Sequence, residues 1–261
     1  MAIHHPTLFE GKKALIFGVA NERSLAWAIA RELHESGATL GFTYMGEALE
    51  RRVRPLAESV GSDLIVPCNV QDDSQIDSVF AQVKEKWGHV DILVHSVAFA
   101  NREDLEGRFV DTSRAGFATA MDISAYSLVA LAKRAEPLME GRDGSILTLS
   151  YYGAEKVVPG YNVMGVAKSA LEGCVRYLAY DMGPKKIRVN AISAGPVKTL
   201  AAAGIRDFRN MLSRAEEKTP LKENISAEDV GALGAFLLGP GGRHITGTTM
   251  YVDSGAHIMG A

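Results

Sequence analysis

Short apolar runs alternate with longer amphipathic stretches along the whole chain. Seven runs have the length and the flanking turn residues expected of buried strands. They cover Lys13–Gly18, Thr39–Tyr44, Asp63–Pro67, Val90–Ser96, Ser145–Ser150, Ile187–Ile192 and, near the end of the chain, Thr248–Asp253. The run Val90–Ser96 is apolar enough to be buried on both faces, which is typical of a parallel sheet.

Helical periodicity fills the gaps between the first four runs. Predicted helices cover Ser24–Ser36, which stops before Gly37, then Glu47–Val60, and Ser74–Trp87, which stops before Gly88. Gly directly after the last periodic residue is a common helix stop. A further helix is expected over residues 161–182. Strand–helix alternation of this kind predicts right-handed crossovers and a parallel sheet.

The chain has 261 residues and no repeat, low-complexity tract or linker. We therefore expect one domain, residues 1–261, with an α/β fold: a Rossmann-type doubly wound domain with a seven-stranded parallel sheet and helices on both faces. The segment 195–218 differs, because it starts with Gly-Pro and has mixed polarity. We interpret it as a small helical lid over the substrate at the carboxyl edge of the sheet, with an ordinary helical insertion as the alternative.

Composition narrows the functional classes. A net charge of -3 gives no reason to expect binding to nucleic acid or to a membrane surface. The two cysteines, Cys68 and Cys174, suit a reducing compartment. Residues 1–9 do not resemble a signal peptide. No apolar run reaches the length of about 18 residues that a membrane-spanning helix needs. We therefore expect a cytoplasmic protein. The seven His residues show no metal-ligand spacing, so no metal site is predicted.

The first strand is followed by a turn that suits a dinucleotide phosphate. Gly18 can form the tight turn, and Ser24 can begin the next helix with its hydroxyl and amide directed at a phosphate. The usual G-x-G-x-x-G pattern is absent, so this segment alone is equally compatible with a plain connection. The second strand ends at Tyr44, and its tip carries neither the acidic residue of a typical NAD site nor the Arg of a typical NADP site. The absence of a basic residue at positions 44 to 47 favours NADH over NADPH.

Three residues near the fifth predicted strand carry the candidate chemistry: Tyr151, Tyr161 and Lys168. On a helix over 161–182, Tyr161 and Lys168 lie two turns apart and leave the same face. A phenol and an ammonium group at the carboxyl end of a strand suit acid chemistry and charge stabilisation beside a dinucleotide.

The motifs together resemble the short-chain dehydrogenase/reductase superfamily, from Gly11 to about Gly255. They comprise the turn Gly18–Ser24, His95–Ala100, Asp122–Ser124, Leu149–Tyr151, Tyr161–Lys168 and Arg188–Pro196. The closer resemblance is to its bacterial branch of enoyl-acyl carrier protein reductases of type II fatty acid synthesis. A typical carbonyl reductase of the superfamily has Tyr four residues before Lys and Ser thirteen before that Tyr. Here these positions are Met164 and Tyr151, and the phenol has moved to Tyr161.

The resemblance implies reduction of the carbon–carbon double bond of trans-2-enoyl thioesters on acyl carrier protein, with NADH as hydride donor. Tyr161 would donate a hydrogen bond to the enolate oxygen. Lys168 would hold the nicotinamide ribose, add positive charge, and favour phenolate character of Tyr161. Tyr151 would shape the pocket or contact the thioester.

The same resemblance implies binding residues. The cofactor set is Gly18, Ser24, Leu25, Met45, Asn69, Val70, Val97, Lys168, Val197, Thr199, Leu200 and Ala201. The acyl pocket set is Ala100, Tyr151, Tyr161 and Met164. Branch members usually have Asp at position 69 and often Gln at position 45, so the adenosine half departs from the pattern here.

Two partners follow from the resemblance as well. Acyl carrier protein is acidic, and Arg206 and Arg209 on the lid are candidate contacts, with solvated helix charges as the alternative. A third position that is often basic is Asn210 here. The second partner is the chain itself, because the resemblance implies a homotetramer.

Two other functions remain open. A 3-ketoacyl or carbonyl reductase of the same superfamily would need Tyr151 to replace the missing serine. A non-catalytic dinucleotide-sensing protein would keep the fold without the chemistry. Such proteins typically lose the Tyr/Lys pair, which is intact in this chain.

Overall fold

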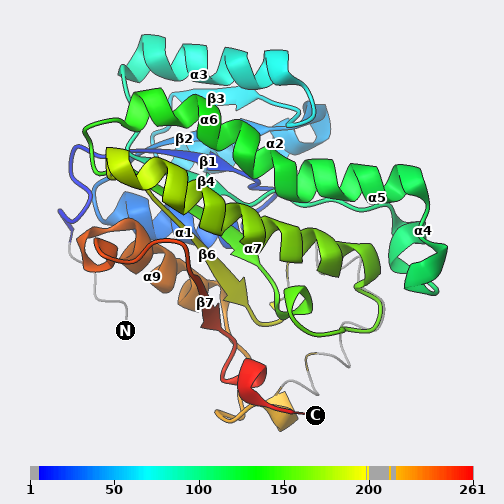
Figure 1. Ribbon diagram of the computed structural model, residues 1–261. Coiled ribbons are helices and arrows are strands. Elements are labelled where there is room, and N and C mark those ends of the chain that lie inside the picture. Colours follow the sequence, from blue (N-terminus) through cyan, green and yellow to red (C-terminus); the bar gives the residue numbers. More distant parts are fainter. Residues whose placement is uncertain (1–5, 198, 200–211, 213–215, 261) are drawn as a thin grey trace.

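The computed structural model describes residues 6–197, 199, 212 and 216–260. Seven parallel strands form one sheet in the order β3-β2-β1-β4-β5-β6-β7 (Figure 1). The strands are β1 Lys13–Phe17, β2 Thr39–Tyr44, β3 Leu64–Pro67, β4 Ile92–His95, β5 Ser145–Ser150, β6 Arg188–Ala194 and β7 Thr249–Val252. The predicted seven-stranded parallel sheet is confirmed, and the boundaries differ from the predicted ones by one or two residues at several ends.

Helices cover both faces of the sheet. They are α1 Leu25–Glu35, α2 Gly46–Ser59, α3 Asp73–Trp87, α4 Arg102–Leu105, α5 Arg114–Met121, α6 Ser127–Met139, α7 Asn162–Met182 and α9 Ala227–Leu238. A π-helical turn, η2 (Asp122–Tyr126), joins α5 to α6, and short 3-10 turns lie at Phe109–Asp111 (η1), Tyr152–Ala154 (η3), Gly183–Lys185 (η4), Pro240–Gly242 (η6) and Ala256–Ile258 (η7).

Alternation along each strand divides the core into two layers. In β1, Leu15 and Phe17 face one layer with α3, α6 and α7, whereas Ala14 and Ile16 face the other with α1, α2 and α9. Figure 1 shows α3, α6 and α7 over one face of the sheet, with α1 and α9 on the other side. Because helices cover both faces, the strands are apolar almost throughout, as the sequence pattern indicated.

The strand order reverses beside β1. The chain first runs outward from β1 to β2 and β3, and then returns to place β4 on the other side of β1. At such a point the connections diverge and leave a crevice outside the carboxyl ends of the strands, where ligands bind in open α/β sheets. The carboxyl ends of β1 and β4 are therefore the expected place for a ligand.

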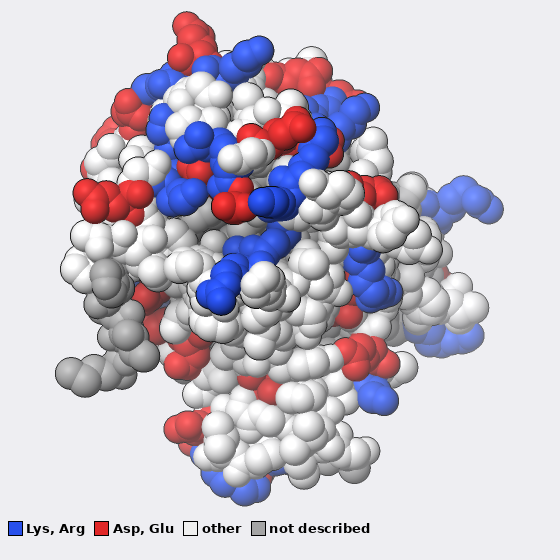
Figure 2. Space-filling view, turned by 60° about the vertical axis from the view of Figure 1, so that its left-hand side comes forward, with Lys and Arg blue, Asp and Glu red and all other residues white. Residues whose placement is uncertain are grey.

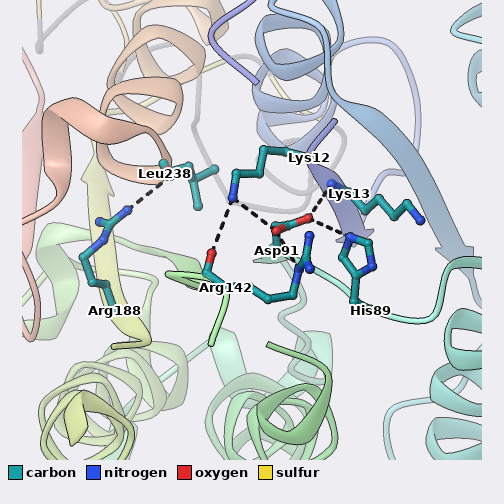
Figure 3. A network of polar contacts seen from close by, with 7 residues as sticks. All are labelled: Lys12, Lys13, His89, Asp91, Arg142, Arg188 and Leu238. Carbon is teal, nitrogen blue, oxygen red and sulfur yellow. Dashed lines mark hydrogen bonds and ion pairs between the residues drawn. The ribbon is translucent and has the colours of Figure 1, made fainter. Parts of the chain in front are cut away.

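The opposite edge of the sheet is fixed by a buried carboxylate, Asp91 (Figure 3). Its oxygens accept hydrogen bonds from the Lys13 backbone N–H (2.9 Å), the Lys12 Nζ (3.2 Å) and the Arg142 Nε (3.0 Å). Nearby, the Arg188 guanidinium donates to the Leu238 carbonyl at the end of α9 (3.2 Å). The buried charge is therefore compensated, and the amino ends of β1, β4 and β5 are tied together far from the carboxyl edge.

A long helical run lies between β4 and β5, where the sequence pattern predicted no element. Residues Arg114–Met139 form 26 continuous helical residues, long and apolar enough to cross a membrane by length and composition alone. Half of the apolar window is buried inside the protein, and α6 packs against α3 and α7. We interpret the run as a core helix, since buried core helices meet the same test.

The surface mixes both signs of charge. On the face drawn in Figure 2, Lys and Arg are interspersed with Asp and Glu over the upper half, and the lower half is mostly uncharged. Interspersed charges keep the long-range electrostatic field of this face weak.

Candidate active site

Helix α7 carries two of the three predicted catalytic residues. Tyr161 occupies the N-cap position, directly before Asn162, so the helix begins one residue later than predicted. Lys168 lies seven residues after Tyr161, about two helical turns, and therefore on the same side of the helix. Tyr151 follows the last residue of β5 and precedes η3. The structure thus brings the carboxyl end of β5 and the first turns of α7 together.

The two tyrosine rings are in direct contact. Their centroids lie 4.9 Å apart with an interplanar angle of 71°, an edge-to-face arrangement. Gly153 lies against both rings: a Cβ atom at this position would come within 2.5 Å of Tyr161 Cδ1 and 3.3 Å of Tyr151 Cδ1. Only a glycine leaves the Tyr161 ring where it is.

Lys168 is a buried ammonium group. Its side chain is 7% exposed, and Nζ donates a hydrogen bond to the carbonyl of Leu149 in β5 at 2.7 Å. Burial lowers the pKa of Lys168 to about 8, and the negative charge of Glu172 opposes part of that shift. The group is therefore mainly charged at neutral pH and loses its charge above about pH 8.

Both phenols are held in the neutral form. Burial raises the pKa of Tyr161, and the neighbouring Tyr151 raises it further. Burial also raises the pKa of Tyr151. The net shift of the Tyr161 pKa is therefore upward, because loss of solvation dominates, and the expected effect of Lys168 on this phenol stays a prediction. A neutral phenol is a hydrogen-bond donor, and this is the form that acid chemistry needs.

The turn after β1 has the geometry of a phosphate site. Gly18 has φ of 97°, and a Cβ there would lie 2.0 Å from the carbonyl oxygen of Ser96, which follows β4. Only glycine allows this close approach of two chain segments at the reversal point. Ser24 is the N-cap residue of α1, as predicted, and Leu25 is the first helical residue. The first turn of a helix leaves backbone N–H groups free of intrahelical partners, and these attract a phosphate.

The Ser24 side chain differs from its expected role. Its hydroxyl oxygen accepts hydrogen bonds from the backbone N–H groups of Ala20 (3.0 Å) and Asn21 (3.1 Å), and its own amide donates to the Asn21 carbonyl. The amide is thus used within the loop and not directed at a ligand. Ser24 instead fixes the shape of the loop between Gly18 and α1.

The other predicted cofactor residues lie at the same edge. Met45, 57% exposed, follows β2 at the start of α2, and Val97 follows β4 and packs on the core. Asn69 and Val70 follow β3, where the Asn69 N–H donates to Gln75 Oε1 (2.8 Å) and Asn69 Oδ1 accepts from the Gln71 N–H (3.1 Å). The predicted cofactor residues therefore follow the carboxyl ends of four neighbouring strands, β3, β2, β1 and β4.

The charges beside β2 bear on cofactor choice. Arg51 forms an ion pair with Glu47 (3.7 Å), and Arg54 with Glu50 (2.5 Å), each one turn along α2. Both guanidinium groups are therefore engaged with carboxylates on α2, the helix that follows β2.

Three of the four residues predicted for the acyl pocket, Ala100, Tyr161 and Met164, lie in or against one small apolar cluster. Met164 is 7% exposed and packs with Ala120, Val163 and Ala167, and Ala100 and Tyr161 lie against the same cluster. The segment that carries Ala100 is fixed by Ser124 in the π turn, whose hydroxyl accepts from the Phe99 N–H (3.0 Å) and donates to the Phe99 carbonyl (3.1 Å).

Some predicted residues cannot be placed. Leu200, Ala201, Arg206, Arg209 and most of the expected lid, 195–218, lie outside the described residues. Val197 and Thr199 are described, and the Thr199 N–H donates to the Val197 carbonyl at 2.8 Å, beyond the end of β6. Over the described ranges, no three His, Cys, Asp or Glu side chains are grouped so that they could hold a metal ion.

Sequence reasoning missed two features of the site. One is Gly153, whose contact with Tyr161 depends on a close approach that no spacing rule predicts. The other is Glu172, which is 8% exposed and accepts a hydrogen bond from Ser150. Its place one turn after Lys168 was a usable signal, since residues four apart share a helix face.

Comparison with known proteins identifies the family. The family described as Enoyl-(Acyl carrier protein) reductase matches residues 18–257. The enoyl-[acyl-carrier-protein] reductase [NADH] of Aquifex aeolicus is 55% identical over 253 residues, which cover 97% of this chain and 94% of that protein. Its crystal structure superposes with a TM-score of 0.94 and covers 97% of this chain and 100% of that one.

Two further structures include a bound dinucleotide. The enzyme of Anaplasma phagocytophilum in complex with NAD is 50% identical, with a TM-score of 0.93, and covers 100% of this chain and 97% of that one. The Bacillus cereus enzyme with NADP+ and indole naphthyridinone is also 50% identical, with a TM-score of 0.95, and covers 97% and 99% of the two chains. With a family match across most of its length and relatives above half identity, this chain belongs to the enoyl-acyl carrier protein reductase family.

Proposed function

We propose that this chain reduces the carbon–carbon double bond of trans-2-enoyl thioesters carried on acyl carrier protein, with NADH as the hydride donor. Membership of the family supports the reaction and the cofactor. The observation that carries the proposal within the site is the half-buried phenol of Tyr161 on the same side of α7 as the buried ammonium of Lys168, which is held at the carboxyl end of β5.

Tyr161 is the proposed donor to the substrate. When bound, NADH would supply a hydride to the β-carbon, so that negative charge would develop on the thioester oxygen until the α-carbon takes up a proton. A neutral phenol strengthens its hydrogen bond as that charge grows, so it stabilises the transition state more than the substrate. A single well-placed donor of this kind contributes about 3–4 kcal/mol.

Lys168 and Tyr151 have supporting roles in this proposal. The Lys168 ammonium binds the ribose hydroxyls of the nicotinamide half and places a positive charge beside the developing enolate. Tyr151 packs edge-to-face with Tyr161, which lies against the cluster of Ala100 and Met164, and in this proposal it forms a wall of the acyl pocket. The turn Gly18–Ser24 and the first amides of α1 bind the pyrophosphate.

The NADH preference is supported by the ion pairs beside β2. Arg54, which is less exposed than Arg51, already pairs with Glu50 at 2.5 Å, and a 2′-phosphate would have to compete with that carboxylate. NADPH is the less favoured cofactor.

The remaining assignments are proposals about context. The partner is acyl carrier protein, with Arg206 and Arg209 as candidate contacts, and the location is the cytoplasm. The active species is a homotetramer built from a single-domain chain, 1–261. Two exposed aromatic residues on α7, Tyr177 (77%) and Tyr180 (83%), and the edge strand β7 support self-association.

The test follows absorbance loss at the dihydronicotinamide band with crotonyl thioester and acetoacetyl thioester in parallel, each with NADH and with NADPH. Oxidation of NADH with the enoyl substrate alone is expected. Oxidation with the ketoacyl substrate alone would mean a carbonyl reductase. Tight cofactor binding without turnover of either substrate would mean a dinucleotide sensor.

A further inference from the structure

Glu172 is a buried acid for which the proposed reaction has so far required no role. It lies on α7 four residues after Lys168, and it is 8% exposed. Acidic side chains are almost never buried unless they are paired, because burial disfavours the charged form. Its burial within one turn of the proposed catalytic lysine therefore needs a physical reason.

Two consecutive residues of β5 hold the two charged side chains. The Ser150 hydroxyl donates a hydrogen bond to Glu172 Oε1 at 2.5 Å. The carbonyl of Leu149 accepts from Lys168 Nζ at 2.7 Å. The ammonium and the carboxylate are therefore fixed to the same strand end and share one face of α7.

Each charge stabilises the other. Burial lowers the pKa of Lys168 to about 8, and Glu172 opposes this shift. Burial raises the pKa of Glu172, and the Ser150 hydrogen bond, Arg176 and Lys168 oppose that shift. The Ser150 hydrogen bond therefore favours the ionised carboxylate, whose charge favours the ammonium.

The other ionisable groups near Lys168 and Glu172 do not take over the role of the Glu172 charge. His95 in β4 interacts electrostatically with Lys168, but its pKa is lowered to about 3 by burial, so it is neutral near pH 7. Glu155, after η3, and Arg176, on the next turn of α7, act on Glu172 and are both exposed. On the ligand side, Lys168 shares its face of α7 with Tyr161, which is also neutral.

We propose that Glu172 is a positioning residue: held by Ser150, it supplies the fixed negative charge that keeps the buried ammonium of Lys168 charged and in place. Glu172 itself does not touch the substrate. This inference rests on the proposed function, because it assigns the charge of Lys168 a role in that reaction.

The test compares pH profiles of kcat/KM for crotonyl thioester reduction by the unmodified chain and by Glu172→Gln. Because the ammonium is required, activity of the unmodified chain falls as the pH rises through about 8. We call this fall in activity the alkaline limb of the profile. Loss of the nearby negative charge moves the alkaline limb to lower pH by about one pH unit. The variant is then about fivefold less active than the unmodified chain at about pH 8, but within about twofold at about pH 6.5.

A control and a second variant keep the result decisive. Asp181→Asn removes an exposed acid from the far end of the same helix and is expected to leave the limb unchanged. Ser150→Ala keeps the carboxyl group but removes its hydrogen bond, and it is expected to move the limb in the same direction by a smaller amount. This variant decides the question if Glu172→Gln does not fold.

Turnover of crotonyl thioester by the unmodified chain tests the proposed function independently of these variants. An unchanged alkaline limb in both folded variants, or an equal loss of activity at every pH, would overturn the role of Glu172. The second pattern would mean a packing defect and not a loss of charge.

Discussion

At the scale of single residues, the site depends on close approaches that tolerate no extra atoms. The Tyr161 ring is bounded by Gly153 on one side and by Tyr151 on another. Sequence patterns predicted the reactive groups, because Tyr161 and Lys168 have a spacing with a chemical meaning. They did not predict Gly153, since its role arises only when the loop after β5 folds back onto α7.

Gly153→Ala is expected to lower kcat about tenfold, which is about 1.4 kcal/mol of transition-state stabilisation. The added methyl group would lie 2.5 Å from Tyr161 Cδ1 and must displace the ring. The dissociation constant for NADH should not change. Steady-state kinetics and a fluorescence titration of NADH measure the two effects.

The matched control for that variant is Gly173→Ala on α7. A Cβ atom at position 173 meets only the end of the Arg176 side chain, at 3.9 Å. This variant should keep full activity and gain up to about 1 kcal/mol of stability, since Ala favours a helix over Gly. Equal kinetics for the two variants would contradict the positioning of Tyr161 by Gly153.

At the scale of elements, the sequence predicted all seven strands of the sheet and the helices α1, α2, α3 and α7, because apolar runs and Gly stops are local signals. It did not predict the short helix α4 or the helix α9. The run 114–139 was not predicted. Its π turn adds one residue to a helical turn, so the apolar positions of α5 and α6 do not follow one continuous period. Asp122 and Ser124 inside it are residues that usually favour turns and caps.

The β1–α1 turn gives a prediction at this scale. Gly18→Ala should abolish measurable NADH binding and destabilise the protein, because its methyl group would overlap the Ser96 carbonyl and because φ is 97°. Gly11→Ala has a similar φ of 76° but nothing within 4 Å, so it should cost only about 1–2 kcal/mol and leave NADH binding intact. Calorimetric titration with NADH separates the two variants. Retained binding by Gly18→Ala would argue against a cofactor site at this turn.

Helix α9 gives a second prediction. Ser226 and Asp229 form a capping box at its start. Ser226→Ala should lower the free energy of unfolding by about 1 kcal/mol. Ser78→Ala, on an exposed part of α3, should change it by no more than a few tenths of a kcal/mol, about the usual range for surface positions. Urea unfolding measures both, and equal values would show that the cap contributes nothing.

At the scale of the whole molecule, the fold separates stabilising charges from reactive ones. Asp91 and its partners tie the amino edge of the sheet, and Lys168 and Tyr161 lie at the carboxyl edge. The fold class followed from strand–helix alternation along the sequence. The residues of the expected lid and the proposed carrier contacts lie outside the described chain, and they remain predictions.

The free energy of unfolding at acid pH should depend on the buried side chain of His95. Its side chain is fully buried, with Nδ1 2.7 Å from Thr148 Oγ1 and Nε2 2.8 Å from Ser127 Oγ, and burial lowers its pKa from 6.5 to about 3. Below about pH 6.5 the unfolded chain binds this proton and the folded chain does not, so stability falls as the pH falls toward 3. The expected contribution is about 1.4 kcal/mol for each pH unit in that window.

The slope of the unfolding free energy against pH tests this contribution best between pH 6.5 and about pH 5, because the carboxyl groups titrate mainly below this range. Urea unfolding across this range should show a flatter dependence in His95→Gln, whatever its absolute stability. His244→Gln, which changes an exposed histidine, should keep the original slope. The same slope in all three proteins would mean that His95 becomes protonated in the folded state.

The most direct measurement of the whole account compares Tyr161→Phe with Tyr151→Phe in NADH-dependent reduction of crotonyl thioester. Both variants keep the aromatic contact and remove one hydroxyl group. If Tyr161 is the donor to the enolate, Tyr161→Phe should lose about a hundredfold or more in kcat with NADH affinity unchanged. Tyr151→Phe should lose about tenfold at most. A larger loss in Tyr151→Phe, or no loss in Tyr161→Phe, would contradict the assignment of Tyr161 as the catalytic donor.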